Sequence, residues 1–192
     1  MPNPLHSAEK PLASATVILV VAATERELAG VEGVETLACG IGPVEAAAAT
    51  ARALAHGTPD ALLHVGLAGR RGFTGCEVVI GSEALYCDAA GPLVPDRVRP
   101  AAGLLARVRE ALPEARVVPI GTSARVGGVQ GCDVEAMEGF AVLRAAELAG
   151  VPAVEVRVVA NEVEEPDRAL WRFDEALGLL REALPRLVAT LS

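Results

Sequence analysis

The chain has 192 residues, of which 52% are hydrophobic, and a formal net charge of −8 at pH 7. This length suits one domain with a substantial core. No apolar run approaches the roughly 20 residues of a membrane-spanning helix, and without a basic stripe we do not expect nucleic acid as a partner.

The first ten residues are polar, and Lys10 is their only positive charge. We therefore expect a flexible N-terminal tail over 1–13, not a signal peptide, followed by a single domain over 14–192. The cysteines form no CxxC pair and have no histidine near them in sequence, which argues against a zinc site and favours reduced thiols in the cytoplasm. They are Cys39, Cys76, Cys87 and Cys132.

Short apolar runs alternate with alanine- and leucine-rich stretches along the chain. Strands are predicted over 16–23, 34–39, 60–65, 77–87, 115–122 and 153–161. Helices are predicted over 43–55, 101–112 and 137–149. Pro43 suits the first turn of a helix, and Gly150 suits a helix end. The segment 91–100 holds three prolines and is expected to be a surface excursion.

The last segment, from Asp167 onward, carries apolar residues at steps of three and four, which predicts an amphipathic helix with one buried face. These residues are Leu170, Phe173, Leu177, Leu180, Leu184, Leu187 and Leu191. Pro185 is expected to kink this helix or to split off its last turn. Strands separated by helices predict an α/β fold with three layers, αβα, around a mixed, mainly parallel, twisted central sheet.

Two glycine-rich segments follow predicted strands. The segment 40–43 reads Gly-Ile-Gly-Pro, but Glu45 stands where a dinucleotide fingerprint needs its third glycine. It is interpreted as a tight turn, or as a turn that lets the backbone approach a ligand. The segment 66–69, Gly-Leu-Ala-Gly, allows either close packing or a floor beneath a flat or sugar-like ligand.

Acidic residues stand close to predicted strand and helix ends. Glu27 follows the first strand and fits a capping box with Thr24, so either a helix N-terminus or a catalytic role is open. Glu135 and Glu138 precede or open a helix, and the same two readings apply. Asn161 ends the strand 153–161, as a turn residue or as a ligand contact.

Ligands of α/β sheets bind at the carboxyl ends of strands. We therefore expect the chemistry where the segments 133–141 and 156–162 meet. His64 lies in an apolar strand and is interpreted as a core histidine.

Taken together, these segments resemble the purine nucleoside phosphorylase and nucleosidase superfamily across nearly the whole chain. The segment 23–28 is similar to the first-strand motif of the methylthioadenosine/adenosylhomocysteine nucleosidases, which implies that Glu27 activates water. The segment 134–139 resembles the superfamily's Met-Glu motif, which implies that Met137 packs on ribose and Glu138 binds its hydroxyls. The segment 40–47 resembles the turn into the first long helix.

The segment 66–69 resembles the superfamily's glycine-rich ligand loop, which implies that Ala68 and Gly69 bind substrate. Arg157 is expected to bind substrate too, or to position Glu138 or Asn161, unless it forms an ordinary ion pair.

Two departures from the superfamily's pattern narrow the implied activity. Asn161 stands where nucleosidases of 6-aminopurines carry Asp, and its amide can donate to N7 and O6 of a 6-oxopurine. His64 and Leu67 stand where bacterial phosphorylases hold phosphate with Arg and Ser, which favours water as the nucleophile. The run 161–172 resembles the Asn-x-Val…Asp-Arg…Trp-Arg signature of the futalosine hydrolases, with Glu-Glu-Pro in place of their Gly-Pro step.

The resemblance implies hydrolysis of the N-ribosidic bond of a 6-oxopurine nucleoside, with futalosine, hypoxanthine and dehypoxanthine futalosine as substrate and products in menaquinone biosynthesis. Glu27, Glu138 and Asn161 are the implied catalytic residues. Arg70, Arg71 and Arg172 are candidates to meet the carboxylate on the 5′ side of futalosine. No metal or organic cofactor is implied, and a homodimer or higher homo-oligomer is expected.

Three alternatives stay open at this point. They are a methylthioadenosine/adenosylhomocysteine nucleosidase, a purine nucleoside phosphorylase, and a non-catalytic purine-binding protein on the same fold.

Overall fold

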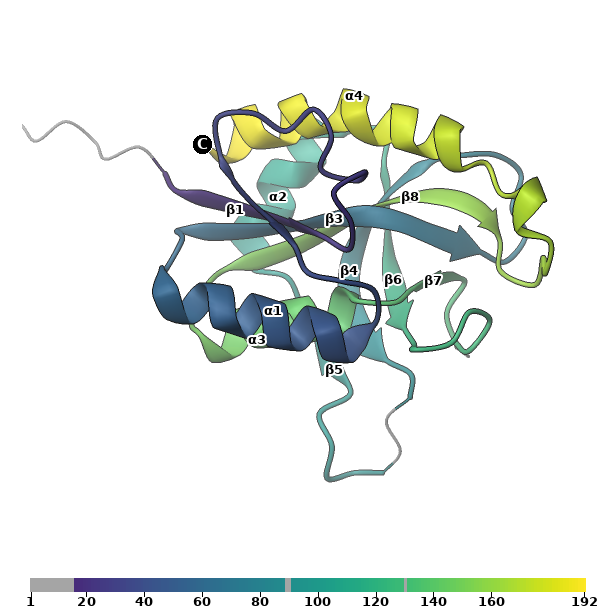
Figure 1. Cartoon of the computed structure of the whole chain (residues 1–192), viewed down its shortest axis with the longest axis horizontal. Coiled ribbons are helices and arrows are strands. Elements are labelled where there is room, and N and C mark those ends of the chain that lie inside the picture. Colours follow the sequence, from purple (N-terminus) through teal and green to yellow (C-terminus); the bar gives the residue numbers. More distant parts are fainter. Residues whose placement is uncertain (1–15, 89–90, 130) are drawn as a thin grey trace, which may run out of the picture.

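Eight strands form one mixed sheet that lies between two pairs of helices (Figure 1). The structure is a computed structural model that describes residues 16–88, 91–129 and 131–192. The predicted N-terminal tail over 1–13 lies outside the described residues. Among the described residues, none of the helices has the length and apolar character needed to cross a membrane.

Six of the eight strands correspond to predicted apolar runs, although β3 continues five residues beyond its predicted end at residue 65; β5, in the expected surface excursion, and β7 were not predicted. They are β1 (Ile18–Ala22), β2 (Glu35–Ala38), β3 (Ala61–Arg70), β4 (Val78–Tyr86), β5 (Arg97–Val98), β6 (Arg116–Thr122), β7 (Val134–Ala136) and β8 (Ala153–Glu162). The pairs β1–β2, β1–β3, β3–β8, β4–β6 and β6–β7 are parallel, whereas β3–β7, β4–β5 and β4–β8 are antiparallel. The predicted three-layer α/β fold with a mixed, mainly parallel sheet is confirmed.

Part of the sheet closes on itself, which the sequence did not predict. The pairings β3–β8, β8–β4, β4–β6, β6–β7 and β7–β3 form a ring of strands. Apolar side chains from these five strands, such as Ile120 and Val159, form a buried cluster. The closing strand β7 places Glu135 beside Gly69 of β3, and β8 places Asn161 on the other side of that glycine.

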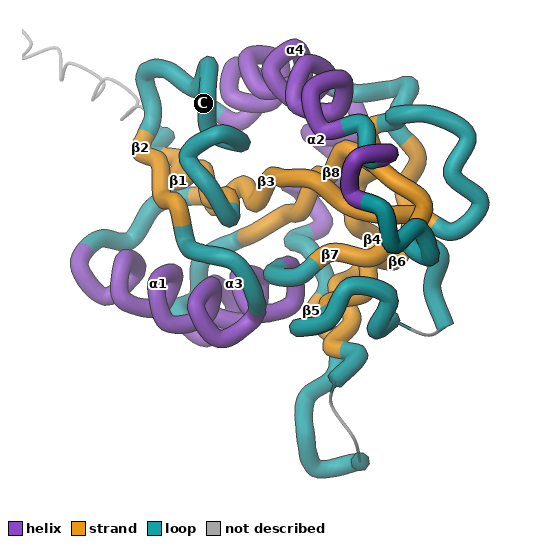
Figure 2. Tube along the Cα trace, turned by 45° about the vertical axis from the view of Figure 1, so that its right-hand side comes forward, coloured by secondary structure: helices purple, strands orange, loops and turns teal. Residues whose placement is uncertain are grey.

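The helices cover the two faces of the sheet in pairs (Figure 2). They are α1 (Pro43–His56), α2 (Ala102–Ala111), α3 (Gly139–Leu148) and α4 (Phe173–Leu191), with a short 3₁₀ helix, η1 (Arg168–Leu170). Helices α1 and α3 pack on one face, and α2 and α4 on the other. Two large apolar clusters fill the layers between the sheet and each helix pair.

The C-terminal helix differs from its prediction at its start. The side chain of Asp167 accepts a hydrogen bond from the Ala169 amide at 2.9 Å, which caps η1 and not a long helix. Helix α4 therefore begins only at Phe173. Leu170 is 63% exposed and Phe173 is 36% exposed, so the prediction that both lie on the buried face is wrong. The other leucines predicted on that face are buried, namely Leu177, Leu180, Leu184, Leu187 and Leu191.

Pro185 neither splits nor ends α4, which continues to Leu191. The proline lies on the exposed face of the helix. Water can therefore satisfy the Arg181 carbonyl that loses its amide donor.

Candidate active site

A cavity of about 670 Å³ lies at the carboxyl ends of β1, β3 and β8. It collects six of the seven residues predicted to act on substrate. These are Glu27, Ala68, Gly69, Met137, Glu138 and Asn161. The segment 66–69 lies within β3 and is not a loop, so Ala68 and Gly69 reach the cavity from the strand itself.

The carboxylate of Glu27 is held by three donors. Its Oε2 accepts hydrogen bonds from the amide and the hydroxyl of Thr24, at 2.9 and 2.8 Å. Its Oε1 accepts one from the Leu67 amide of β3, at 3.0 Å. The bond to the Thr24 amide is half of the predicted capping box, but turns follow it in place of a helix. A carboxylate has about four accepting positions, so Oε1 retains one that can point to a ligand.

Glu138 is the N-cap residue of α3 and is buried. Its Oε1 accepts a hydrogen bond from the Gly42 amide at 3.0 Å, and its Oε2 lies 3.5 Å from Nη2 of Arg157. Gly42 has a φ of 94° in the left-handed region that favours glycine. The backbone of the turn 40–43 thus approaches the Glu138 carboxylate, whereas one of the two predictions was that it approaches a ligand.

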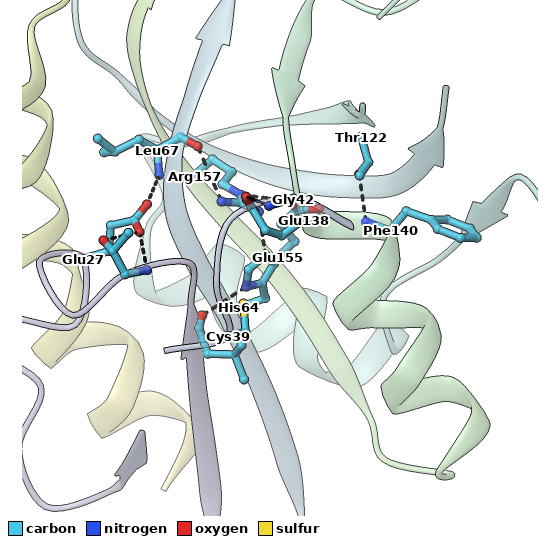
Figure 3. A network of polar contacts seen from close by, with 12 residues as sticks. Glu27, Cys39, Gly42, His64, Leu67, Thr122, Glu138, Phe140, Glu155 and Arg157 are labelled. Atoms are coloured by element: carbon cyan, nitrogen blue, oxygen red, sulfur yellow. Dashed lines mark hydrogen bonds and ion pairs between the residues drawn. The ribbon is translucent and has the colours of Figure 1, made fainter. Parts of the chain in front are cut away.

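Arg157 lies beneath the cavity and is 1% exposed. It is absent from the cavity lining found among the described residues. Its Nε donates to Glu155 at 2.8 Å, and its Nη1 donates to the Leu67 carbonyl at 3.4 Å. Direct substrate binding by Arg157, as predicted, does not fit this placement, whereas the alternative of positioning Glu138 does (Figure 3).

His64 is fully buried in β3, as a core histidine should be. Its Nδ1 lies 3.0 Å from the Val21 carbonyl, which can only accept, so Nδ1 carries the proton. The other ring nitrogen, Nε2, then accepts from Nη2 of Arg157. Burial, and secondly the charge of Arg157, lower the pKa of His64 well below its usual range, so the ring is neutral.

Asn161 lies near the end of β8 and lines the cavity. Its Nδ2 donates to the Glu162 carbonyl at 2.8 Å, which leaves the second amide hydrogen and the Oδ1 for a ligand. Its register partner is Gly69, where a Cβ would come within 3.0 Å of that nitrogen. The glycine therefore lets the amide lie across β3.

A wall of the cavity comes from the segment 123–129, to which the sequence assigned no role. Glu135 of β7 accepts hydrogen bonds from the amides of Gly127 and Val129. These bonds hold the segment so that Arg125 and Val126 line the cavity. The Glu135 side chain therefore holds the backbone of the segment 123–129. It does not cap a helix, although it was predicted to precede or open one.

Aromatic and cationic side chains form another part of the lining. Trp171 donates from Nε1 to the Glu165 carbonyl at 3.0 Å, which fixes its ring. The guanidinium of Arg168 lies 5.4 Å from the centre of that ring, within cation–π range. Phe173 packs against Trp171 with ring centres 5.4 Å apart.

The three arginines predicted to meet a ligand carboxylate lie elsewhere. Arg70 pairs with Glu77, Arg71 donates to the Val129 and Cys132 carbonyls, and Arg172 pairs with Glu175. In the part of the chain that the structure describes, these three do not line the cavity. The arginines that do are Arg26, Arg125 and Arg168.

Several contributors to the site carry no signal in the sequence. The amide of Leu67 and the segment 123–129 contribute through the backbone, which any residue type supplies. Glu155 is the exception, because a carboxylate in an otherwise apolar strand is a detectable anomaly.

Comparisons with known proteins agree with this fold. A futalosine hydrolase from Streptomyces coelicolor is 35% identical, over 83% of this chain and 80% of that protein. A methylthioadenosine/adenosylhomocysteine nucleosidase from Streptococcus pneumoniae, solved with a transition-state inhibitor, superposes with a TM-score of 0.77 at 21% identity, covering 92% of this chain and 98% of that one. A futalosine hydrolase mutant of Helicobacter pylori has a TM-score of 0.77 at 16% identity, with the same coverage.

Residues 22–192 match the sequence profile of the Phosphorylase superfamily. This match covers nearly all of the described fold and every residue that lines the cavity. The chain belongs to the Phosphorylase superfamily.

Proposed function

We propose that this protein hydrolyses the N-ribosidic bond of futalosine and releases hypoxanthine. The observation that carries the proposal is the convergence of Glu27, Glu138 and Asn161 from three separate elements on one cavity. The Streptomyces coelicolor futalosine hydrolase, with its 35% identity, supports the substrate.

The proposed reaction passes through a ribosyl oxocarbenium ion while negative charge grows on the departing base. Glu27, fixed by Thr24 and Leu67, orients a water molecule and takes its proton. General base catalysis of this kind contributes typically 10²–10⁴-fold. The three donors restrict the carboxylate to one direction, which lowers the cost of aligning the water.

Glu138 binds the ribose. Its Oε2 is only loosely paired with Arg157, at 3.5 Å, and so can accept hydrogen bonds from the sugar hydroxyls. Its negative charge also favours the cationic sugar of the transition state. Met137, which lines the cavity beside it, packs on the ribose face.

Asn161 holds the leaving base. The amide hydrogen that is not bound to the Glu162 carbonyl can donate to N7 or O6 of hypoxanthine. An amide cannot give up a proton, so water delivers the proton that the departing base needs.

Arg168 and Trp171 suit the benzoate group that futalosine carries on its 5′ side. Arg168 has no carboxylate within ion-pair distance among the described residues, whereas Arg26 faces Asp174 at 3.5 Å. The ring of Trp171 offers a surface for an aromatic group, and the guanidinium offers two parallel hydrogen bonds to its carboxylate.

Incubation with futalosine in phosphate-free buffer tests the proposed function. We expect hypoxanthine and dehypoxanthine futalosine as products, at a rate that added phosphate does not raise. A rate that depends on phosphate would instead indicate a phosphorylase. Release of adenine from methylthioadenosine without any release of hypoxanthine from futalosine would refute the proposal that futalosine is the substrate.

Replacing Arg168 with Gln tests the carboxylate contact. We expect KM for futalosine to rise about tenfold, the value of one charge-assisted hydrogen bond. Hydrolysis of inosine, which has no carboxylate, should be unchanged. The control is Arg172→Gln, because Arg172 is a neighbouring arginine that pairs with Glu175. An equal loss on both nucleosides would contradict the assignment of Arg168.

We also propose, from the superfamily resemblance, that the enzyme works as a homo-oligomer in the cytoplasm. Sedimentation of the purified protein measures its oligomeric state.

A further inference from the structure

Glu155 is a buried carboxylate to which the proposed reaction gives no role. It is the third residue of β8 and is completely buried. Its Oε1 accepts a hydrogen bond from Nε of Arg157 at 2.8 Å, while its Oε2 has no hydrogen-bond partner among the described residues. An unsatisfied buried oxygen costs stability, and buried ion pairs are weak evidence for a stabilising role. The carboxylate therefore needs another explanation.

The contacts of Arg157 supply one. The guanidinium makes its closest ion pair with Glu155, at 2.8 Å, and a looser one with Glu138, at 3.5 Å. The first contact uses the Nε edge and the second uses Nη2 (Figure 3). We propose that Glu155 is a positioning residue, which holds Arg157 by its Nε edge and so keeps the pairing with Glu138 loose enough for Glu138 to bind ribose. This inference rests on the proposed function.

The packing around Glu155 leaves its carboxylate little freedom. A Cβ added at Gly139, the first residue of α3, would come within 2.6 Å of its Cδ. A Cβ added at Gly81 of β4 would lie 3.4 Å from its Cβ. These two glycines therefore make room for the Glu155 side chain. Glu138 directly precedes Gly139, so Glu155 and the proposed ribose-binding carboxylate lie close together.

Removal of the Glu155 charge should redirect Arg157. Glu138 would then be the nearest carboxylate, and the guanidinium could turn toward it and form a short, bidentate ion pair. Such a pair occupies the Oε2 of Glu138 that the ribose hydroxyls need. The expected result is weaker binding of the sugar and slower formation of the cationic transition state.

The titratable groups that face Arg157 decide how the pH profile responds. They are Glu138 at the start of α3, Glu27 after β1, His64 of β3 and Cys39 after β2, besides Glu155 on the same strand. Burial raises the pKa of the Cys39 thiol to about 11, and it lowers that of His64. Both groups are therefore neutral across the working range. Burial raises the pKa of the Glu155 carboxyl, and the charge of Arg157 opposes that rise.

The test compares Glu155→Gln with the wild type on whichever nucleoside the wild type hydrolyses best. We expect kcat/KM to fall about 10- to 100-fold, because misplaced catalytic groups cost up to about 10²-fold. The acid limb of kcat/KM should move to lower pH, since one negative neighbour has gone and the charge of Arg157 acts on fewer carboxylates. Glu155→Asp keeps the charge, and its acid limb should stay in place.

A matched control and a double-mutant cycle complete the test. Glu147→Gln removes a carboxylate from α3 that pairs only with Arg144 in the described structure, and it should change nothing. In a Glu138→Gln background, measured at high enzyme concentration, Glu155→Gln should add little further loss if it acts through Glu138.

Three results would overturn the proposal. They are an unchanged rate and pH profile in Glu155→Gln, a fully additive loss in the Glu138→Gln background, and a failure of both Glu155 variants to fold, which would make the residue purely structural. A wild type that hydrolyses none of the nucleosides would refute the proposed function itself, and this inference with it.

Discussion

Replacing Glu27 with Gln should lower kcat about 10²–10⁴-fold, the usual contribution of a general base. The amide keeps the size of the side chain, and its oxygen can still accept from Leu67 or Thr24. It cannot take a proton from water at neutral pH, so hydrolysis loses its base while the cavity keeps its shape. Binding of the nucleoside should therefore stay within about threefold of the wild type, because Glu138 and Asn161 are untouched.

Rate and binding can be measured separately in this variant. Hypoxanthine release gives kcat, and the fluorescence of Trp171 reports binding, because it is the only tryptophan in the chain and lines the cavity. The matched control is Glu25→Gln, since Glu25 is an exposed acid two residues away. Turnover by Glu27→Gln at the wild-type rate would remove Glu27 as the base.

Replacing Asn161 with Asp should reverse the preference between 6-oxopurine and 6-aminopurine nucleosides. A protonated Asp can donate to N7, and its other oxygen can accept from a 6-amino group but not from O6. An unmatched buried polar group costs about 1–3 kcal/mol. The substitution removes a mismatch with 6-aminopurines and creates one with 6-oxopurines. We therefore expect the ratio of activities on the two kinds of nucleoside to change about 10²-fold.

The selectivity ratio is measured as kcat/KM for inosine divided by that for adenosine. Asn161→Ala serves as the control, because it removes the amide without offering an acid and should slow both substrates. A ratio that stays the same in Asn161→Asp would show that Asn161 does not read the base, and with it the argument for a 6-oxopurine would fail.

Much of the fold was predictable because its sequence signals are local. The strands were predicted from short, continuous apolar runs, and α4 from leucines at steps of three and four residues. The ring of strands was not predictable, since β7 has only three residues and lies in a glycine-rich segment. A strand so short has no period to detect, and only its neighbours in space define it.

The candidate site also contains both residues that the sequence indicated and residues that it did not. The residues alone left Glu27, Glu138 and Asn161 open between structural and functional roles, and the resemblance to the superfamily implied that they are catalytic. The cavity wall from Arg125 to Val126 was missed, because its position depends on backbone bonds to Glu135 that no local pattern reveals. The three arginines named as candidates for a ligand carboxylate, Arg70, Arg71 and Arg172, do not line the cavity of the described structure, because they contact neighbouring groups that the sequence does not reveal.

Leu67 contributes both of its main-chain polar groups to the site, with its amide on Glu27 and its carbonyl on Arg157. The proposed water-activating group and the support of the proposed sugar-binding group are thus positioned by one residue, and a shift of β3 would move the two together. The preceding Gly66 has no room for a side chain, because a methyl group there would come within 2.7 Å of the Glu27 carboxylate and 2.5 Å of the guanidinium.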